Sequence, residues 1–398
     1  MRILSIETSC DDTCVAVLEV KEKERPSFKI LSNIVSSQVK LHAKYGGVYP
    51  MLAKREHQRN LAPVLKRALE EARLLKPNVK SQKSKLQLSV RNDLKNIDLI
   101  AVTTGPGLEP CLWVGVNFAK ELAEKLNIPL IPVNHIEAHI LVNFVDSNLK
   151  LPPVPNLRRA GKTHKLKAIT FPAVCLVVSG GHTQLILMNN FGAYKIIGET
   201  RDDAAGECFD KTARILGLGY PGGQIIAAYA ATKLKTKNEK VKIKLPRPML
   251  HTKDYDFSFS GLKTAVLYSY QKSSIKNQDY TRAMCKEIQQ AIIDVLIKKT
   301  MKAAADYKVK TIILGGGVTA NQELKKQLEY KLNTINSPEK KSKISNEADK
   351  LILLVPPREL CTDNAAMIAV TAYFNQSKKT RDWKKIEADA NLRIGETV

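Results

Sequence analysis

Near its N-terminus the chain reads Arg2-Ile3-Leu4-Ser5-Ile6-Glu7-Thr8-Ser9-Cys10-Asp11-Asp12-Thr13-Cys14-Val15-Ala16-Val17-Leu18-Glu19. Two short apolar runs, at residues 2–6 and 15–19, are predicted to be β-strands. Between them, residues 7–13 gather hydroxyl and carboxylate side chains in one turn. The turn lacks the glycines and the lysine of a Walker A loop. The stretch therefore predicts a β-hairpin with a polar, ligand-binding turn at the start of a sheet.

Outward from this hairpin, short β-branched runs alternate with longer stretches of helical periodicity. This alternation is typical of α/β layers around a central sheet. Further strands are predicted at residues 97–103, 130–133, 173–178, 184–188, 311–314 and 351–355, and helices at 53–74, 112–126, 202–216, 223–231, 281–305, 320–331 and 363–375. No solenoid repeat is present, although two halves with the same order of elements would not show as sequence identity.

Composition bounds the class of protein. A chain of 398 residues with 44% hydrophobic residues indicates two or three folded domains. No apolar run reaches the roughly 18 to 20 residues that span a bilayer, and Met1 leads directly into the first predicted strand, so we expect a cytoplasmic protein. The seven cysteines form no CxxC pair, which argues against a disulfide framework and a thiolate zinc site.

The formal net charge of +24 favours an anionic polymer as a partner, because binding releases counterions from phosphates. Much of the excess lies in basic inserts at residues 76–95, 149–167, 233–247 and 333–350. Solvated loops explain each of these inserts equally well. Aromatic residues are nearly absent from them, so platforms for stacking single-stranded bases are not indicated.

His135 and His139 stand four residues apart in Asn134-His135-Ile136-Glu137-Ala138-His139. On a helix this spacing places both side chains on one face, about 6 Å apart, where two imidazoles can share a cation. A third ligand must come from elsewhere in the chain. The alternative is a pair of partly exposed histidines on an amphipathic helix.

Four glycine loops follow predicted strands. They are Val177-Val178-Ser179-Gly180-Gly181-His182-Thr183, Leu314-Gly315-Gly316-Gly317-Val318-Thr319-Ala320-Asn321, Gly105-Pro106-Gly107-Leu108 and Tyr220-Pro221-Gly222-Gly223. The first predicts a hairpin turn whose backbone N–H groups can hold a phosphate, and the second can also present a helix N-terminus to a nucleotide. Each alone is more often an ordinary tight turn than a binding site, because turn chemistry needs the same residues.

In order and spacing these motifs resemble the TsaD family of tRNA adenosine threonylcarbamoyltransferases, formerly named O-sialoglycoprotein endopeptidases. The same resemblance extends to Asp202-Asp203-Ala204-Ala205-Gly206-Glu207, Phe209-Asp210-Lys211, Asp256-Phe257-Ser258-Phe259-Ser260-Gly261-Leu262-Lys263 and Cys361-Thr362-Asp363-Asn364-Ala365-Ala366-Met367. It implies an α/β, actin-like ATPase (ASKHA) fold of two lobes around a nucleotide and metal cleft. The first lobe would comprise residues 1–134 and 361–398, and the second residues 135–360 with the basic insert loops.

The resemblance also implies an activity: transfer of threonylcarbamoyl from threonylcarbamoyl-AMP to the exocyclic amine of the adenosine next to the anticodon, in tRNAs that read codons beginning with A. AMP is released. The family's metal ligands fall on His135, His139 and Asp363, for iron or, alternatively, zinc. The adenylate-binding residues fall on Val177, Val178, Ser179, Gly180, Gly181, Asp210, Gly223 and Asn321. Asp11 is the candidate catalytic or orienting carboxylate.

Val177 stands where archaeal and eukaryotic relatives place a metal-binding tyrosine, and together with His182 it indicates the bacterial-type branch. For that branch the resemblance implies tRNA as a partner, a catalytically inert TsaB-type paralogue, a small TsaE-type P-loop ATPase and a separate enzyme that makes the adenylate. A homodimer, as in mitochondrial relatives, is the alternative assembly.

Three other functions compete with the transferase. A zinc metalloprotease needs His-Glu-x-x-His, whereas here Glu137 lies midway between the histidines. A sugar or acetate kinase would share the fold but would not need two histidines and an aspartate around a metal. A non-catalytic assembly subunit would not need to retain all three ligands and both glycine loops.

Overall fold

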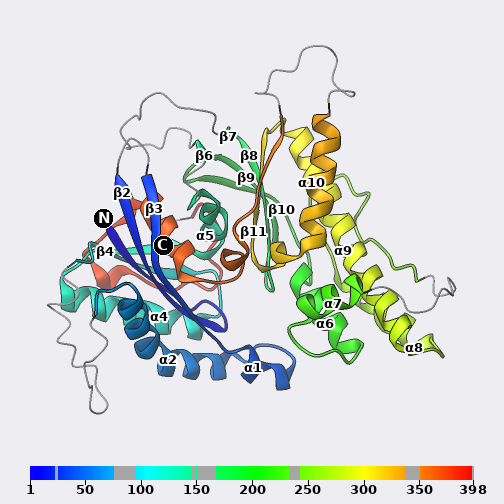
Figure 1. Ribbon diagram of the computed structural model, residues 1–398, viewed down its shortest axis with the longest axis horizontal. Helices are drawn as coiled ribbons and strands as arrows, with labels where there is room; N and C mark the ends of the chain where they lie inside the picture. The colour runs from blue at the N-terminus through cyan, green and yellow to red at the C-terminus, as the bar shows by residue number, and fades with distance from the viewer. Residues whose placement is uncertain are drawn as a thin grey trace. The chain divides into compact units, whose positions relative to one another are not determined.

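The computed structural model describes residues 1–22, 26–75, 96–145, 149–150, 167–232, 243–337 and 350–396 (Figure 1). The basic insert at residues 76–95 and most of the other three lie outside the described residues. The chain divides into two compact units. The first comprises Met1–Leu41, Val48–Ala168 and Asp363–Val398, and the second comprises His42–Gly47 and Ile169–Thr362.

The bounds of these units differ from those of the lobes expected from sequence. Residues 135–168 belong to the first unit rather than the second, and the C-terminal return to the first unit begins at Asp363. The physical reason is a packing contact between two helices, α5 (His135–Leu141) and α11 (Ala365–Phe374).

The first unit is built on a five-stranded sheet of order β3-β2-β1-β4-β5. Its strands are β1 (Arg2–Glu7), β2 (Asp12–Glu22), β3 (Pro26–Ser37), β4 (Leu99–Gly105) and β5 (Leu130–Asn134). β1, β2 and β3 form an antiparallel meander, and β4 and β5 run parallel to β1. The first unit also contains the short pair β6 (Leu149–Lys150) and β7 (Lys167–Ala168).

Helices cover both faces of this sheet. Besides α5 and α11, the helices that pack on it are α2 (Pro50–Glu71) and α4 (Glu109–Leu126), and the short α1 (Val39–His42) precedes α2 in the chain. Leu4 and Ile6 on β1 share a hydrophobic core with residues of α2 and α4. Ser5 points to the opposite face, where its hydroxyl donates to the Ala365 carbonyl of α11 at 2.6 Å. Successive side chains alternate between faces, so β1 is buried on both sides.

The second unit repeats the same topology with a sheet of order β10-β9-β8-β11-β12. Its strands are β8 (Ala173–Val178), β9 (Thr183–Asn190), β10 (Ala193–Glu199), β11 (Thr311–Gly315) and β12 (Ile352–Leu354). The first three are again an antiparallel meander, and β11 and β12 run parallel to β8. Two units with one strand order are the duplicated architecture of the actin-like ATPase fold, so the predicted fold class is confirmed.

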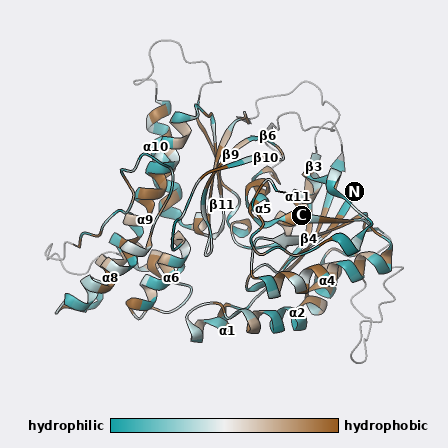
Figure 2. Cartoon of the chain, turned by 180° about the vertical axis from the view of Figure 1, so that it is seen from behind, coloured by the Kyte–Doolittle hydropathy of each residue, from teal (hydrophilic) through white to brown (hydrophobic). Residues whose placement is uncertain are grey.

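The helices of the second unit pack onto its sheet through one hydrophobic core. They are α6 (Ala205–Ile215), α7 (Gly222–Ala231), α8 (Ser260–Lys272), α9 (Gln278–Asp306) and α10 (Gln322–Asn336). Hydropathy colouring in Figure 2 shows hydrophobic and hydrophilic residues alternating along α10. On that helix Leu324, Leu328 and Leu332 are buried, at the three- to four-residue interval of an amphipathic helix.

The predicted strands and helices are all present, whereas β3, β10, α8 and the short elements α1, β6 and β7 were not predicted. β3 and β10 are edge strands in which few residues are fully buried, so their hydrophobic patterns are weak. All seven cysteines are free, as expected, and six of them are buried. Among the described residues, no helix combines the length and the apolar character needed to cross a bilayer.

Candidate functional site

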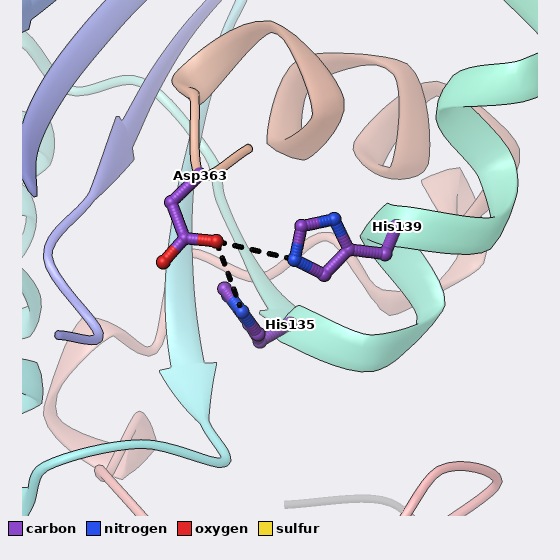
Figure 3. Close-up of side chains that lie close together, drawn as sticks. All are labelled: His135, His139 and Asp363. Carbon is purple, nitrogen blue, oxygen red and sulfur yellow. Dashed lines mark hydrogen bonds and ion pairs between the residues drawn. The ribbon is translucent and has the colours of Figure 1, made fainter. Parts of the chain in front are cut away.

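His135 and His139 lie one helical turn apart on α5, with His135 as its first residue (Figure 3). The helix begins directly where β5 ends, because the side chain of Asn134 caps it. The Asn134 amide oxygen accepts hydrogen bonds from the backbone N–H groups of Ile136 at 2.9 Å and Glu137 at 3.1 Å. Both histidines are therefore presented at the carboxyl edge of the parallel strands of the first unit. Both are buried.

Asp363 comes from the N-terminal end of α11 and faces the two imidazoles (Figure 3). Its Oδ1 atom lies 3.2 Å from His139 Nε2 and 3.6 Å from His135 Nε2. The two rings are 4.7 Å apart between centroids and nearly perpendicular, at 85°. The three side chains meet although Asp363 lies 224 residues beyond His139 in the chain. The helical pair and its third predicted partner are thus brought together within the first unit.

These three side chains fit a divalent metal ion. Each offers one ligand atom, and the three atoms lie within 4.8 Å of one another. Metal–ligand bonds of about 2.0–2.1 Å in tetrahedral geometry separate neighbouring ligand atoms by about 3.3 Å, close to the spacings from Asp363 to both histidines. Two imidazoles and one carboxylate suit iron or zinc and leave coordination positions for substrate oxygens.

The two histidines differ in their ionisation. Burial lowers the pKa of His139 and keeps its imidazole neutral. Burial also acts to lower the pKa of His135, but the nearby carboxylates of Asp363 and Glu7 outweigh it and raise this pKa to about 9. A metal ligand must present a lone pair, so binding of a cation has to displace a proton from His135.

Glu7 has no predicted role of its own, and the structure places it beside His135, one of the predicted metal ligands. It ends β1, is 0% exposed, and lies next to Thr103 of β4 and His135 of α5. The carboxyl ends of the three parallel strands β1, β4 and β5 meet at this point. An acidic residue that closes an otherwise apolar strand is the sequence signal that identifies it.

The turn after β1 is held by a buried histidine that sequence reasoning missed. One ring nitrogen of His57 on α2 lies 2.8 Å from the Thr13 hydroxyl, and the other lies 2.9 Å from the Cys10 carbonyl oxygen. Asp11, the candidate catalytic carboxylate, sits half-buried between these two anchor points. No local pattern reveals His57, because it is 44 residues from Thr13 in the chain.

Asp12 gives the metal-free protein a specific pH dependence. One of its oxygens, Oδ1, is enclosed without a hydrogen-bond partner. Burial raises the pKa of Asp12 from 3.8 to about 7. Below about pH 4 the Asp12 carboxyl is protonated in both the folded and the unfolded protein. Between about pH 4 and pH 7 it ionises only in the unfolded chain, so the free energy of unfolding falls as the pH rises. Above about pH 7 it is ionised in both, and the free energy of unfolding falls no further on its account.

We therefore expect Asp12→Asn to stabilise the metal-free protein increasingly from about pH 4.5 to about pH 8. The full shift would correspond to roughly 4 kcal/mol, and partial solvent contact reduces the expected gain to about 2 kcal/mol. Thermal unfolding at several pH values measures the gain. A difference between Asp12→Asn and wild type that stays constant over this range would contradict the raised pKa.

Glu137, midway between the two histidines in sequence, is paired with a residue beyond α11. It is buried, and its Oε2 atom accepts a hydrogen bond of 2.8 Å from the Asn375 side chain just beyond α11. A metalloprotease needs a carboxylate beside the metal as its general base. The structure gives Glu137 a packing role instead, and so does not favour proteolysis.

In the second unit, residues 179–182 form the predicted hairpin turn between β8 and β9. The Ser179 N–H donates to the His182 carbonyl at 2.8 Å, and the His182 N–H donates to the Ser179 hydroxyl at 3.1 Å. Gly180 and Gly181 are exposed, and a Cβ atom added to either would meet nothing within 4 Å. This open space leaves their backbone accessible to an anionic ligand.

The second glycine loop lies against the first. A Cβ atom on Gly316 would fall 2.4 Å from the Val178 carbonyl oxygen, and Gly316 has a φ of 88°. The N-terminus of α6 joins them, because the Gly206 N–H donates to the Ser179 carbonyl at 3.2 Å. Both loops follow adjacent parallel strands, β8 and β11, at the carboxyl end where α/β sheets bind ligands.

The other predicted adenylate-binding residues have structural partners of their own. Asp210 Oδ1 accepts a hydrogen bond of 2.7 Å from the Gly222 N–H at the start of α7, next to Gly223. The Asn321 amide oxygen caps α10, and its amide nitrogen donates to Gln289 at 2.9 Å. All the predicted adenylate-binding residues belong to the second unit.

A profile of the family described as "TsaD: tRNA N6-adenosine threonylcarbamoyltransferase" matches residues 29–168 and 159–370. A protein named tRNA N6-adenosine threonylcarbamoyltransferase from Syntrophomonas wolfei is 43% identical over 378 residues, 95% of this chain and 93% of its own. One of the same name from Thermosipho africanus is 42% identical over 394 residues, 99% of this chain and 100% of its own.

Among solved structures, full-length HypF in a phosphate- and nucleotide-bound form is similar to this chain with a TM-score of 0.50. The identity is 11%, and the match covers 98% of this chain and 47% of the longer HypF chain. At this identity the likeness concerns the fold alone. The likeness agrees with the finding that the two five-stranded sheets share one strand order.

Proposed function

Because the chain belongs to the TsaD family of tRNA N6-adenosine threonylcarbamoyltransferases, we propose that it transfers threonylcarbamoyl from threonylcarbamoyl-AMP to a tRNA adenosine. The acceptor in this proposal is the exocyclic amine of the adenosine next to the anticodon, in tRNAs that read codons beginning with A. AMP is the second product.

The observation that carries this proposal is the convergence of His135, His139 and Asp363. These three side chains approach one another in the way that ligands of a divalent cation do. A cation held there, iron or alternatively zinc, would supply Lewis acidity to carbonyl or phosphate oxygens of the donor. A kinase of the same fold has no use for such a triad.

The proposed reaction needs no covalent intermediate on the protein. The adenosine amine is a weak nucleophile, since its lone pair is delocalised into the ring, and the mixed anhydride compensates by being strongly electrophilic. The amine nitrogen forms a bond to the carbamoyl carbon, the bond from that carbon to the phosphate oxygen breaks, and AMP departs with the electron pair. The amine gives up one proton. The protein then has to bind and orient the adenylate and the tRNA adenosine, and to accept the proton that the amine gives up.

For the adenylate we propose the glycine loops of the second unit. The support is the exposed backbone of Gly180 and Gly181, which has room for a ligand, and the adjoining N-terminus of α6. Backbone N–H groups and a helix N-terminus stabilise the phosphate of a departing AMP. Asp210 and Asn321 then contribute by fixing the starts of α7 and α10, in addition to any direct contact with the nucleotide.

Asp11 is proposed to position or deprotonate the attacking amine. With Asp11→Asn we expect the transfer rate to fall about 10²-fold or more, as loss of a general base does, with unchanged affinity for tRNA. Single-turnover transfer from labelled adenylate measures the first quantity, and filter binding the second. Glu121→Gln, which removes a carboxylate that is 70% exposed on α4, serves as the control with wild-type rates. Near-normal transfer by Asp11→Asn would exclude the role.

Transfer of labelled threonylcarbamoyl from its adenylate to unmodified tRNA tests the proposed function as a whole. The protein is assayed alone and with the proposed partners, a catalytically inert TsaB-type paralogue and a small TsaE-type P-loop ATPase. Product in any combination supports the transferase. Tight adenylate binding without product in every combination would instead indicate a non-catalytic assembly subunit.

A further inference from the structure

We propose that Glu7 is a positioning residue that orients His135 for metal binding and ties this ligand to the turn that carries Asp11. The role requires the triad to hold a cation, as the proposed function does, but it concerns metal binding rather than transfer. It can therefore be tested without tRNA or adenylate.

The Glu7 carboxylate is enclosed and held from three sides. Its Oε1 atom accepts a hydrogen bond of 2.5 Å from the Ser9 backbone N–H. Its Oε2 atom accepts one of 2.5 Å from the Thr103 hydroxyl and lies 3.2 Å from His135 Nδ1. Burying a carboxylate that is 0% exposed would destabilise the folded protein if it lacked such partners. The contacts leave it little freedom to move.

This arrangement selects the imidazole tautomer that a metal needs. A carboxylate beside His135 Nδ1 favours a proton on that nitrogen. The lone pair is then left on Nε2, the atom that faces Asp363 Oδ1 at 3.6 Å. A carboxylate behind a ligating histidine fixes the ring and raises its basicity. The Ser9 hydroxyl also lies 3.2 Å from His135 Nδ1, but it carries no charge.

His139 supplies an internal contrast. Its Nδ1 atom is buried without a hydrogen-bond partner among the described residues. Of the two imidazoles, only His135 therefore has a carboxylate behind it. We expect the contribution of Glu7 to metal affinity to act through His135 alone.

The same carboxylate reaches the turn that precedes β2. Through Oε1 it holds the Ser9 N–H, two residues before Asp11, and through Oε2 it faces the metal ligand. A neutral amide cannot serve both contacts. In Glu7→Gln the oxygen can accept from Ser9, but the NH₂ group then faces His135 Nδ1 and favours the tautomer with a proton on Nε2, which blocks metal binding.

The test is titration of the metal-free protein with Co²⁺ and, by competition with a chromophoric chelator, with Zn²⁺. We expect Glu7→Gln to raise the dissociation constant for the metal about 10- to 100-fold, the usual effect of losing a group that hydrogen-bonds to a metal ligand. The visible absorption of bound Co²⁺ should also change. Thr103→Val is the matched control, because it removes another hydrogen bond of the same oxygen and retains the charge. It should bind Co²⁺ within about threefold of wild type with an unchanged spectrum.

A second measurement does not depend on the folding of a variant. In Zn²⁺-loaded wild type labelled with ¹⁵N-histidine, His135 should show a protonated Nδ1 and a metal-bound Nε2. Metal bound through Nδ1, or equal Co²⁺ affinity and spectrum in wild type and Glu7→Gln, would overturn the role of Glu7 alone. Wild type that binds neither metal would overturn it together with the metal site of the proposed function.

Discussion

Metal content and transfer activity are expected to disappear together when His139 is replaced by alanine. His139 is 0% exposed, and its Nε2 atom lies 3.2 Å from Asp363 Oδ1. Removing it leaves one imidazole and one carboxylate, too few protein ligands for a retained site. We expect the transfer rate to fall about 10³-fold or more, equivalent to roughly 4 kcal/mol of transition-state stabilisation.

Two further variants separate the loss of a ligand from damage to the fold. Asp363→Asn keeps the shape of the third ligand and removes its charge, so it should also lose metal. His251→Ala removes an exposed histidine of the second unit and should behave as wild type. Metal content by elemental analysis and the midpoint of thermal unfolding are measured for each. A His139→Ala protein that retains both metal and transfer would remove the triad from the mechanism.

The second large effect is expected from Gly316→Ala, which should lower the free energy of unfolding. Gly316 has a φ of 88°, and an added Cβ would lie 2.4 Å from the carbonyl oxygen and 2.8 Å from the carbonyl carbon of Val178. The backbone of β8 cannot yield as a flexible side chain would, because it is paired with β9 and β11. We expect a loss of about 3 kcal/mol or more in the second unit, from strain and from separation of the two loops.

Gly181→Ala is the matched control for this effect, because it adds the same methyl group to the neighbouring loop. There a Cβ meets nothing within 4 Å, and the expected loss is below about 1 kcal/mol. Thermal unfolding midpoints and hydrogen exchange of the β8 and β11 amides compare the two variants. Equal stability of Gly316→Ala and Gly181→Ala would show that the loops do not pack as described.

The elements that carried a strong local pattern were predicted from sequence. The helical spacing of His135 and His139 and the apolar strands before each glycine loop are properties of neighbouring residues. Edge strands β3 and β10 were missed because so few of their residues are fully buried. The adenylate-binding assignments of Asp210 and Asn321 rest on the family resemblance and stay predictions.

The third member of the proposed metal site could not be predicted from spacing. Asp363 was assigned through the resemblance to a family, and the structure supplies the reason for its position. α11 packs against β1 and α5, and Asp363, two residues before its first residue, therefore reaches both histidines. The same packing explains why residues 135–168 belong to the first unit.

The sequence by itself determined most of the strands and helices, that two imidazoles share one helical face, and that glycine turns follow apolar strands. Such features depend on residues within a few positions of one another, where backbone geometry dictates the arrangement. Only the tertiary structure decided that Glu7 stands behind His135, 128 residues away, and that His57 holds the Asp11 turn. Contacts of this kind form when the carboxyl ends of separate strands are drawn to one edge of a sheet, and no local pattern encodes that edge.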